Sequence, residues 1–96
     1  DTMALGAQAA IDAAGKGDII VMGFDGNDNV LDSIKQGKID GTVMQPNAKN
    51  AQMAVELADK YIKTGSTGLD EEKILNDCFL ITPENADQWR GFTKIK

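Results

Sequence analysis

Apolar residues near the start of the chain recur at the spacing of an α-helix, which predicts a first helix that ends at Gly15. The apolar face of this helix consists of Met3, Ala7, Ala10, Ile11 and Ala14. Either Asp1 or Thr2 can cap its first turn. Because the face is mostly alanine, we expect the helix to lie close against a sheet.

Two strands and a short helix are predicted next. Residues 19–22 are apolar at every position, and such a run fits a strand covered on both faces, as in a parallel sheet. Residues 39–44 predict a second strand, which ends before Pro46 because proline cannot continue a central strand. Between them lies a short helix capped by Asn27 or Asp28. Its inward side chains are Val30, Leu31 and Ile34.

A long helical pattern runs over residues 47–63. Its broad inner face carries Ala51, Ala54, Val55, Ala58, Tyr61 and Ile62. The glycine-rich segment 64–68 breaks the helix as a flexible connector, and 69–73 is an acidic surface stretch. Residues 74–81 predict a last strand.

The final segment has the signals of a helix start. Thr82 is a capping residue, Pro83 suits the first helical position, and Glu84 is an acidic residue in the first turn. We therefore expect a short helix that carries Ala86 and Trp89. Helices that alternate with strands at this spacing predict the α/β class with a parallel sheet.

Composition and charge limit the kinds of partner and functional site that the chain can have. The 96 residues suffice for one small domain or a piece of a larger one, and the net charge of -5 argues against a nucleic-acid partner. The sequence has no histidine, which removes the usual zinc sites and histidine-assisted nucleophiles, so we expect no metal, cofactor or catalytic residue. The single cysteine, Cys78, lies in an apolar run and is expected to be buried. We find no bilayer-spanning apolar run and expect no signal peptide at Asp1.

The segment GFDGNDN, residues 23–29, invites several interpretations. As a calcium loop it supplies Asp25, Asn27 and Asn29 at the first three ligand positions, but Val30 and Gln36 replace the required Gly and Glu. The calcium interpretation therefore fails. The segment also lacks the third glycine of a dinucleotide fingerprint, no Walker motif is present, and no carboxylate pair stands out for glycoside hydrolysis.

Topology offers a further interpretation. Ligands of open parallel sheets bind beyond the carboxyl ends of the strands, and Asp25 and Gln45 each follow a predicted strand. A right-handed crossover would bring both ends to one rim. A carboxylate and an amide together suit the hydroxyl groups of a neutral sugar. The alternative stays open that Asp25 belongs to an ordinary turn or helix cap and that Gln45 is a loop residue.

These residues lie within three motifs that resemble one family closely. DTMALGA at 1–7, IIVMGFDG at 19–26 and GKIDGTVMQ at 37–45 resemble the C-terminal third of the periplasmic monosaccharide-binding proteins, the ribose- and galactose-type components of ABC importers. The resemblance covers nearly the whole chain and is strongest over 1–63. It implies a periplasmic-binding-protein type I fold, of which this chain would be a C-terminal fragment.

The family fold has two lobes joined by three hinge strands, with the sugar enclosed between them. The resemblance implies that residues 1–45 and 79–96 belong to the second lobe and that 46–78 cross into the first. The hinges would lie near Gln45-Pro46 and Asp77-Cys78. The long helix would then expose a large apolar face unless the missing N-terminal portion, or a partner chain, covers it.

The resemblance also assigns ligand contacts. A carboxylate at the position of Asp25 binds sugar hydroxyls in the family, and Gln45 stands at a second contact position, where glutamine favours a pentose such as ribose. Asp1 and Phe24 are expected near the site. The family's asparagine contact precedes the residue that matches Asp1, and the aromatic and arginine contacts come from earlier segments. Tyr61 and Trp89 are expected in core packing or at the surface.

The implied function is reversible sugar binding by hinge closure, without catalysis. The implied partners are a monosaccharide, the membrane permease of an ABC importer and, for some members, a chemoreceptor. The implied location is the periplasm, or the outer surface of a Gram-positive cell on a lipid anchor. Two rivals are the effector-binding core of a lactose-repressor-type regulator, which a preceding helix-turn-helix would favour, and an α/β enzyme, which the missing histidine disfavours.

Overall fold

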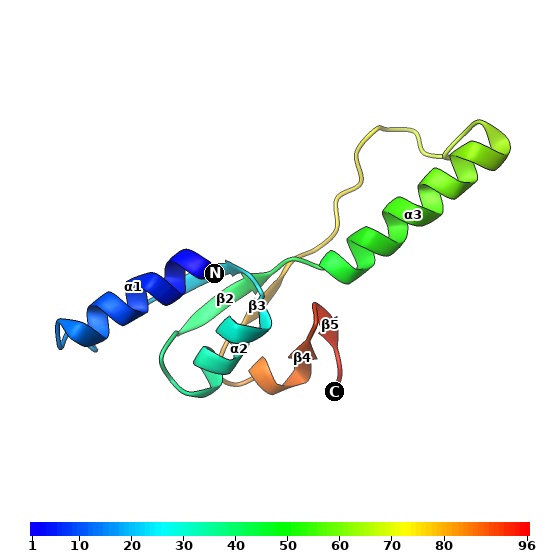
Figure 1. Cartoon of the computed structure of the whole chain (residues 1–96). Helices are drawn as coiled ribbons and strands as arrows, with labels where there is room; N and C mark the ends of the chain where they lie inside the picture. Colours follow the sequence, from blue (N-terminus) through cyan, green and yellow to red (C-terminus); the bar gives the residue numbers. More distant parts are fainter.

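The computed structural model describes all residues, 1–96, as three helices around small sheets. In chain order the elements are α1 (Thr2–Ala13), β1 (Met22–Asp25), α2 (Asp28–Lys35), β2 (Gly41–Met44), α3 (Asn47–Thr64), β3 (Phe79–Ile81), the 3-10 helix η1 (Ala86–Gln88), β4 (Trp89–Arg90) and β5 (Thr93–Lys94). Figure 1 shows α1 and α3 pointing away from a central region that holds β1, β2, β3, α2 and the C-terminal hairpin. No helix is long and apolar enough to cross a membrane.

The central sheet has the strand order β1-β2-β3. β1 and β2 are parallel, with Asp25 opposite Met44, which confirms that prediction. β3 is antiparallel to β2, with Phe79 opposite Met44, so the expectation of a wholly parallel sheet is wrong. The reason is that α3 runs away from the sheet instead of crossing back over it, and the returning chain enters β3 beside the end where β2 left (Figure 1).

One face of this sheet carries the core. The predicted inward side chains of α2 (Val30, Leu31 and Ile34) are fully buried, which confirms the helical pattern. They belong to a buried apolar cluster that also contains Ala4, Val21, Ile39, Met44, Ile81, Ala86 and Trp89. Met44 and Ile81 contribute from the sheet, so α2 and the C-terminal segment cover the same face.

The opposite face of the sheet is bare. Side chains alternate along a strand, and the register places Phe24, Val43 and Leu80 in one row across the sheet. Phe24 and Leu80 are 52% and 58% exposed. The prediction that a strand over 19–22 is covered on both faces is therefore wrong: β1 starts only at Met22, and the apolar residues just before it lie largely in a solvent-exposed segment.

Helix α1 begins and ends where the sequence predicts, and Gly15 follows it in the left-handed region, with φ +67. Of the predicted contact face, Ile11 is partly buried against the core cluster, but the rest of the prediction is wrong. The buried residues are Ala4 and Gln8, whereas Met3 is 88% exposed. Only the start of α1 reaches the sheet, and the rest of the helix extends beyond it (Figure 1), so few of its apolar side chains find a surface to contact.

Helix α3 has no buried residue at all. Val55 is 70% and Ile62 82% exposed, as expected of an apolar face that nothing in this chain covers. Cys78, at the return from this region, is also exposed, so its predicted burial is wrong. The chain is accordingly elongated, with extents of 59 × 25 × 17 Å and a radius of gyration of 17.4 Å. A compact domain of this length has a radius of gyration of about 13 Å.

The C-terminal segment differs from the predicted helix. Its helical part is limited to η1, and Trp89 begins the β4–β5 hairpin instead. The side chain of Asn85 accepts the N–H of Thr82 at 2.8 Å and donates to the carbonyl of Leu80 at 3.0 Å, and the N–H of Ala86 donates to the carbonyl of Thr82 at 2.9 Å. These bonds close one turn, and the chain becomes extended at Trp89, with φ -126 and ψ 141. Trp89 is buried against Phe79, with ring centroids 4.9 Å apart, as its predicted packing role requires.

Candidate functional site: the carboxyl ends of two parallel strands

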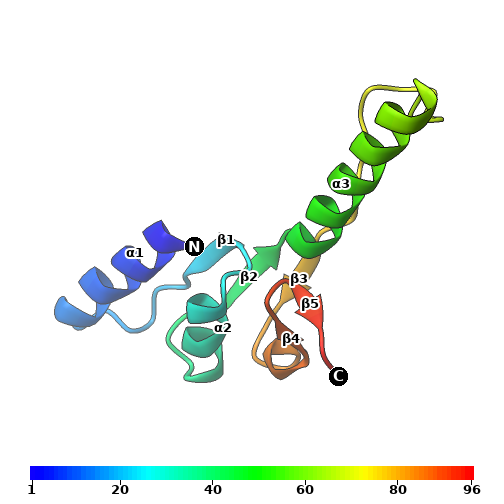
Figure 2. The same cartoon turned by 45° about the vertical axis from the view of Figure 1, so that its right-hand side comes forward.

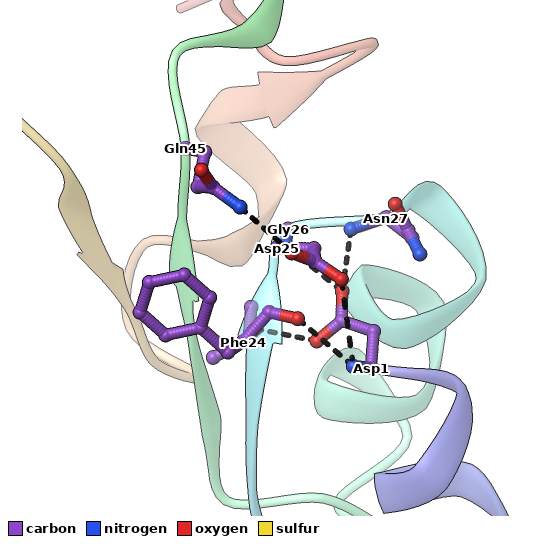
Figure 3. A network of polar contacts seen from close by, with 7 residues as sticks. Asp1, Phe24, Asp25, Gly26, Asn27 and Gln45 are labelled. Atoms are coloured by element: carbon purple, nitrogen blue, oxygen red, sulfur yellow. Dashed lines mark hydrogen bonds and ion pairs between the residues drawn. The ribbon is translucent and has the colours of Figure 1, made fainter.

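The structure brings Asp25 and Gln45 together at the carboxyl ends of β1 and β2, as the topology predicts. The side-chain amide of Gln45 donates a hydrogen bond to Asp25 Oδ1 at 2.8 Å, and the backbone N–H of Gln45 donates to the Asp25 carbonyl at 3.1 Å. Figure 3 shows the Gln45 amide pointing towards the Asp25 carboxylate. The Asp25 side chain remains 46% exposed, so its carboxylate keeps free acceptor positions for a ligand.

The backbone at Asp25 is strained. Its φ of 129 lies outside the regions that residues with a side chain favour, and Gly26 follows at φ 85. A side chain at Gly26 has no room, because an added Cβ would lie 2.8 Å from the Cα of Met44. The chain therefore passes close over the end of β2 here, and this close approach sets the Asp25 carboxylate beside Gln45.

An ordinary capping role does not account for these polar residues. Asn27 is the N-cap residue of α2, yet its side chain makes no capping hydrogen bond. The Asp25 carboxylate instead accepts a hydrogen bond from the side-chain amide of Gln45 across the strand ends. The capping bond that the alternative interpretation of GFDGNDN expects from Asn27 is therefore not formed.

Asp1 contributes the buried part of the network. The sequence predicts it as a cap of the first helix, and it does occupy the N-cap position of α1, but it makes no side-chain capping bond there. Its side chain is fully buried, and Oδ2 accepts the N–H groups of Gly26 at 2.8 Å and Asn27 at 2.6 Å. Oδ1 accepts the hydroxyl of Thr42 at 2.6 Å. The carboxylate therefore joins α1, β2 and the turn that follows β1 (Figure 3).

Phe24 does not join this group. Its backbone carbonyl accepts a 2.8 Å hydrogen bond from the Asp1 nitrogen, but its ring points away from the Asp25 carboxylate (Figure 3) and belongs to the bare face of the sheet. The strand alternation that puts Asp25 on one face puts its neighbour on the other. The expectation that Phe24 lies near the site thus holds for its backbone and not for its ring.

The largest hollow of the chain lies elsewhere. It has a volume of about 590 Å³, is open to solvent, and lies between α3 and residues 67–76, far along the chain from the polar pair. Met53, Leu57 and Ile74 give it an apolar floor. Its rim also carries polar side chains, and two of them, Asn76 and Asn50, hydrogen-bond to each other at 2.7 Å. No group of three or more acidic, cysteine or histidine side chains is arranged to hold a metal ion.

Comparison with known proteins identifies the family of this chain. Residues 1–67 match the periplasmic binding protein domain family. The D-apiose import binding protein of Actinobacillus succinogenes is 57% identical over all of this chain, and that of Paraburkholderia graminis is 56% identical over 90% of it. The ribose import binding protein of Bacillus subtilis is 51% identical over 65% of the chain.

A solved structure is similar as well. An ABC transporter solute binding protein from Bacillus halodurans, determined with bound myo-inositol, superposes with a TM-score of 0.81 over 97% of this chain, at 35% identity. The chain spans only 31% of that protein and 31% of the Actinobacillus relative. The family match and the solved structure show a periplasmic-binding-protein type I fold. The chain belongs to the periplasmic binding protein domain family.

Proposed function

We propose that this chain supplies one wall of the cleft of a sugar-binding component of an ABC importer. The observation that carries the proposal is the hydrogen-bonded pair of Asp25 and Gln45 on the rim of the parallel strands. A half-exposed carboxylate accepts hydrogen bonds from adjacent hydroxyls, and an amide both donates and accepts. The pair thus suits a neutral, polyhydroxylated ligand, and the importer names of the relatives point the same way.

For the ligand we propose a pentose. The family resemblance associates glutamine at position 45 with a pentose such as ribose, and relatives carry the names of apiose and ribose import binding proteins. The Gln45 amide lies 2.8 Å from Asp25, so one hydroxyl can lie within reach of both side chains. We therefore place D-apiose beside D-ribose as the sugars to test first.

We further propose that residues 1–45 and 79–96 form part of one lobe and that 46–78 reach into the other. This division is supported by the contrast between the buried cluster around α2 and the projecting α3, which Figure 2 shows from a second direction. The apolar face of α3 would then pack against the other lobe, which would also cover the hollow beside α3. The hinges would lie at Gln45-Pro46 and Asp77-Cys78, where the chain enters and leaves the projection.

In this proposal the sugar stabilises a closed form, because both lobes contact it only when they are shut. The closed form would deliver the sugar to the membrane permease, and a chemoreceptor is a second partner of the same surface. The proposed location is the periplasm, or the exterior of a Gram-positive cell. The importer names of the relatives favour transport over the regulator and enzyme hypotheses.

The test is calorimetric titration of the full-length protein with D-ribose, D-apiose and myo-inositol, each in a separate experiment. We expect saturable binding of one sugar per protein, with a pentose tighter than the inositol. If myo-inositol binds tighter, the pentose assignment is wrong and the sugar-binding proposal stands. If none of the three sugars binds, the proposed function itself is contradicted.

A further inference from the structure

The strained turn at Asp25 requires something to hold it in place. A residue with a side chain rarely adopts a φ of 129, and such a conformation persists only where its surroundings fix it. Two successive N–H groups follow directly, those of Gly26 and Asn27, and both donate to the same oxygen, Asp1 Oδ2. The turn is therefore fixed by one carboxylate that reaches it from another part of the sequence.

Asp1 is itself held rigidly. Its side chain is fully buried, its second oxygen accepts the Thr42 hydroxyl, and its backbone nitrogen donates to the carbonyl of Phe24. An added Cβ on Gly23 would collide with Asp1 Oδ1 and would lie 3.3 Å from Thr42 Oγ1, so glycine at this position of β1 leaves the space that the carboxylate fills. These contacts leave the carboxylate little freedom to move relative to the two strand ends.

We propose that Asp1 is a positioning residue for the sugar site: it holds the Asp25–Gly26–Asn27 turn so that the Asp25 carboxylate meets Gln45 and the ligand. This inference rests on the proposed function, because it takes Asp25 as the ligand contact. Asp1 does not touch the ligand itself, since its side chain is buried beneath the turn. Its effect on affinity passes through the backbone of the turn.

The test uses the full-length protein with the substitutions Asp1→Ala and Asp1→Asn. Alanine removes the acceptor of both turn N–H groups, and we expect the affinity for D-ribose, measured by calorimetry, to fall about tenfold, within the range for lost acceptors of buried donors. Asparagine keeps one oxygen for the turn, and its amide can face the Thr42 hydroxyl oxygen, which accepts hydrogen bonds. We therefore expect Asp1→Asn to restore most of the affinity.

Asp40→Ala is the matched control. The Asp40 carboxylate accepts the N–H of Val21 at 2.8 Å, just before the opposite end of β1, so it makes a similar contact away from the site. We expect this variant to lower the unfolding temperature while its ribose affinity stays within about twofold of the wild type. If Asp1→Ala weakens ribose binding no more than Asp40→Ala does, or if Asp1→Asn is as weak as Asp1→Ala, the positioning role is overturned.

A second measurement separates this inference from the proposed function. Amide hydrogen exchange at Gly26 and Asn27 needs no sugar, and it reports directly on the two N–H groups that Asp1 accepts. We expect exchange at both amides to accelerate in Asp1→Ala and not in Asp40→Ala. Unchanged exchange would contradict the positioning role even if ribose binds. Accelerated exchange without sugar binding would show that Asp1 holds the turn and would reject the proposed function. Asp1→Asn keeps one oxygen for the turn, so exchange at both amides should stay close to that of the wild type in this variant.

Discussion

Helices α2 and α3 have similar sequence patterns and opposite surroundings. Each carries an apolar face at helical spacing, but the inward side chains of α2 are fully buried, whereas α3 buries none of its residues. The difference lies in what this chain provides: the sheet and the C-terminal hairpin cover α2, and no element of the chain covers α3. An amphipathic pattern thus predicts that a face needs a partner without saying which segment supplies it.

The largest expected effect comes from the buried side of this comparison. Leu31→Ala in α2 should lower the free energy of unfolding by about 2–5 kcal/mol, because it removes a fully buried side chain and leaves a cavity. Val55→Ala in α3 should change it by no more than about 0.5 kcal/mol in the 96-residue chain. Urea denaturation of both variants measures the two values, and similar losses would contradict the observed packing.

The effect of Val55→Ala should be larger in the full-length protein than in the 96-residue chain. If the other lobe covers α3, Val55→Ala loses about two buried carbon groups and should cost about 1.5 kcal/mol in that context. The paired measurement in the short chain is the control, because there Val55 is 70% exposed. An equally small effect in both contexts would show that the apolar face of α3 stays uncovered and would contradict the proposed lobe division.

A smaller effect is expected where the C-terminal hairpin meets α2. Arg90 lies 3.4 Å from Asp28 and 3.0 Å from Asp32, and Asp28 also accepts the N–H of Gly91 at 2.8 Å. Arg90→Ala should destabilise the chain by up to about 1 kcal/mol, and less at high salt, because these groups are half-exposed. Lys35→Ala is the control, since its single contact with Asp32 is longer, at 3.8 Å. Equal losses of stability in Arg90→Ala and Lys35→Ala would contradict the expectation that Arg90 contributes more than Lys35.

The smallest effect concerns Glu84. The Thr82 hydroxyl donates to its carboxylate at 2.5 Å, and this bond, with a backbone hydrogen bond, lowers the pKa of Glu84 below its ordinary value. The folded state therefore favours the charged form, so the contribution is present above the unfolded-state pKa and is lost as the pH falls through the folded-state pKa. We expect Thr82→Val to raise the pKa of Glu84 in an NMR titration. An unchanged pKa would show that the hydroxyl is not its cause.

Much of the fold follows from sequence because its determinants are local. The apolar spacing of α2, the glycine after α1 and the proline after β2 act within a few residues, and the three helices α1, α2 and α3 are present near their expected positions, whereas the strand predicted over 74–81 is limited to Phe79–Ile81. Asp25 and Gln45 could be paired because parallel strands bring their carboxyl ends to one rim. The direction of the Phe24 ring could not be predicted equally well, because it depends on where β1 starts and on its register.

The features that the sequence did not predict depend on contacts between distant segments, which local patterns do not reveal. The antiparallel entry of β3 follows from the path of α3 away from the sheet, and the exposure of Cys78 follows from the same path. The hairpin at Trp89 pairs this residue with Lys94 and packs its ring against Phe79, contacts that a helix-start pattern at Thr82 does not reveal. Asp1 was predicted as a cap of its own helix, and only the tertiary fold shows that its carboxylate serves the turn at Gly26 instead.

The central claim is that Asp25, held beside Gln45, binds sugar hydroxyls. Calorimetric titration of the full-length protein with D-ribose, in the wild type and in Asp25→Ala, tests it most directly, with Asp18→Ala as a control for an exposed carboxylate outside the network. We expect Asp25→Ala to lose about 2–5 kcal/mol of binding free energy and Asp18→Ala to lose none. Ribose binding of equal strength in the wild type and Asp25→Ala would contradict it.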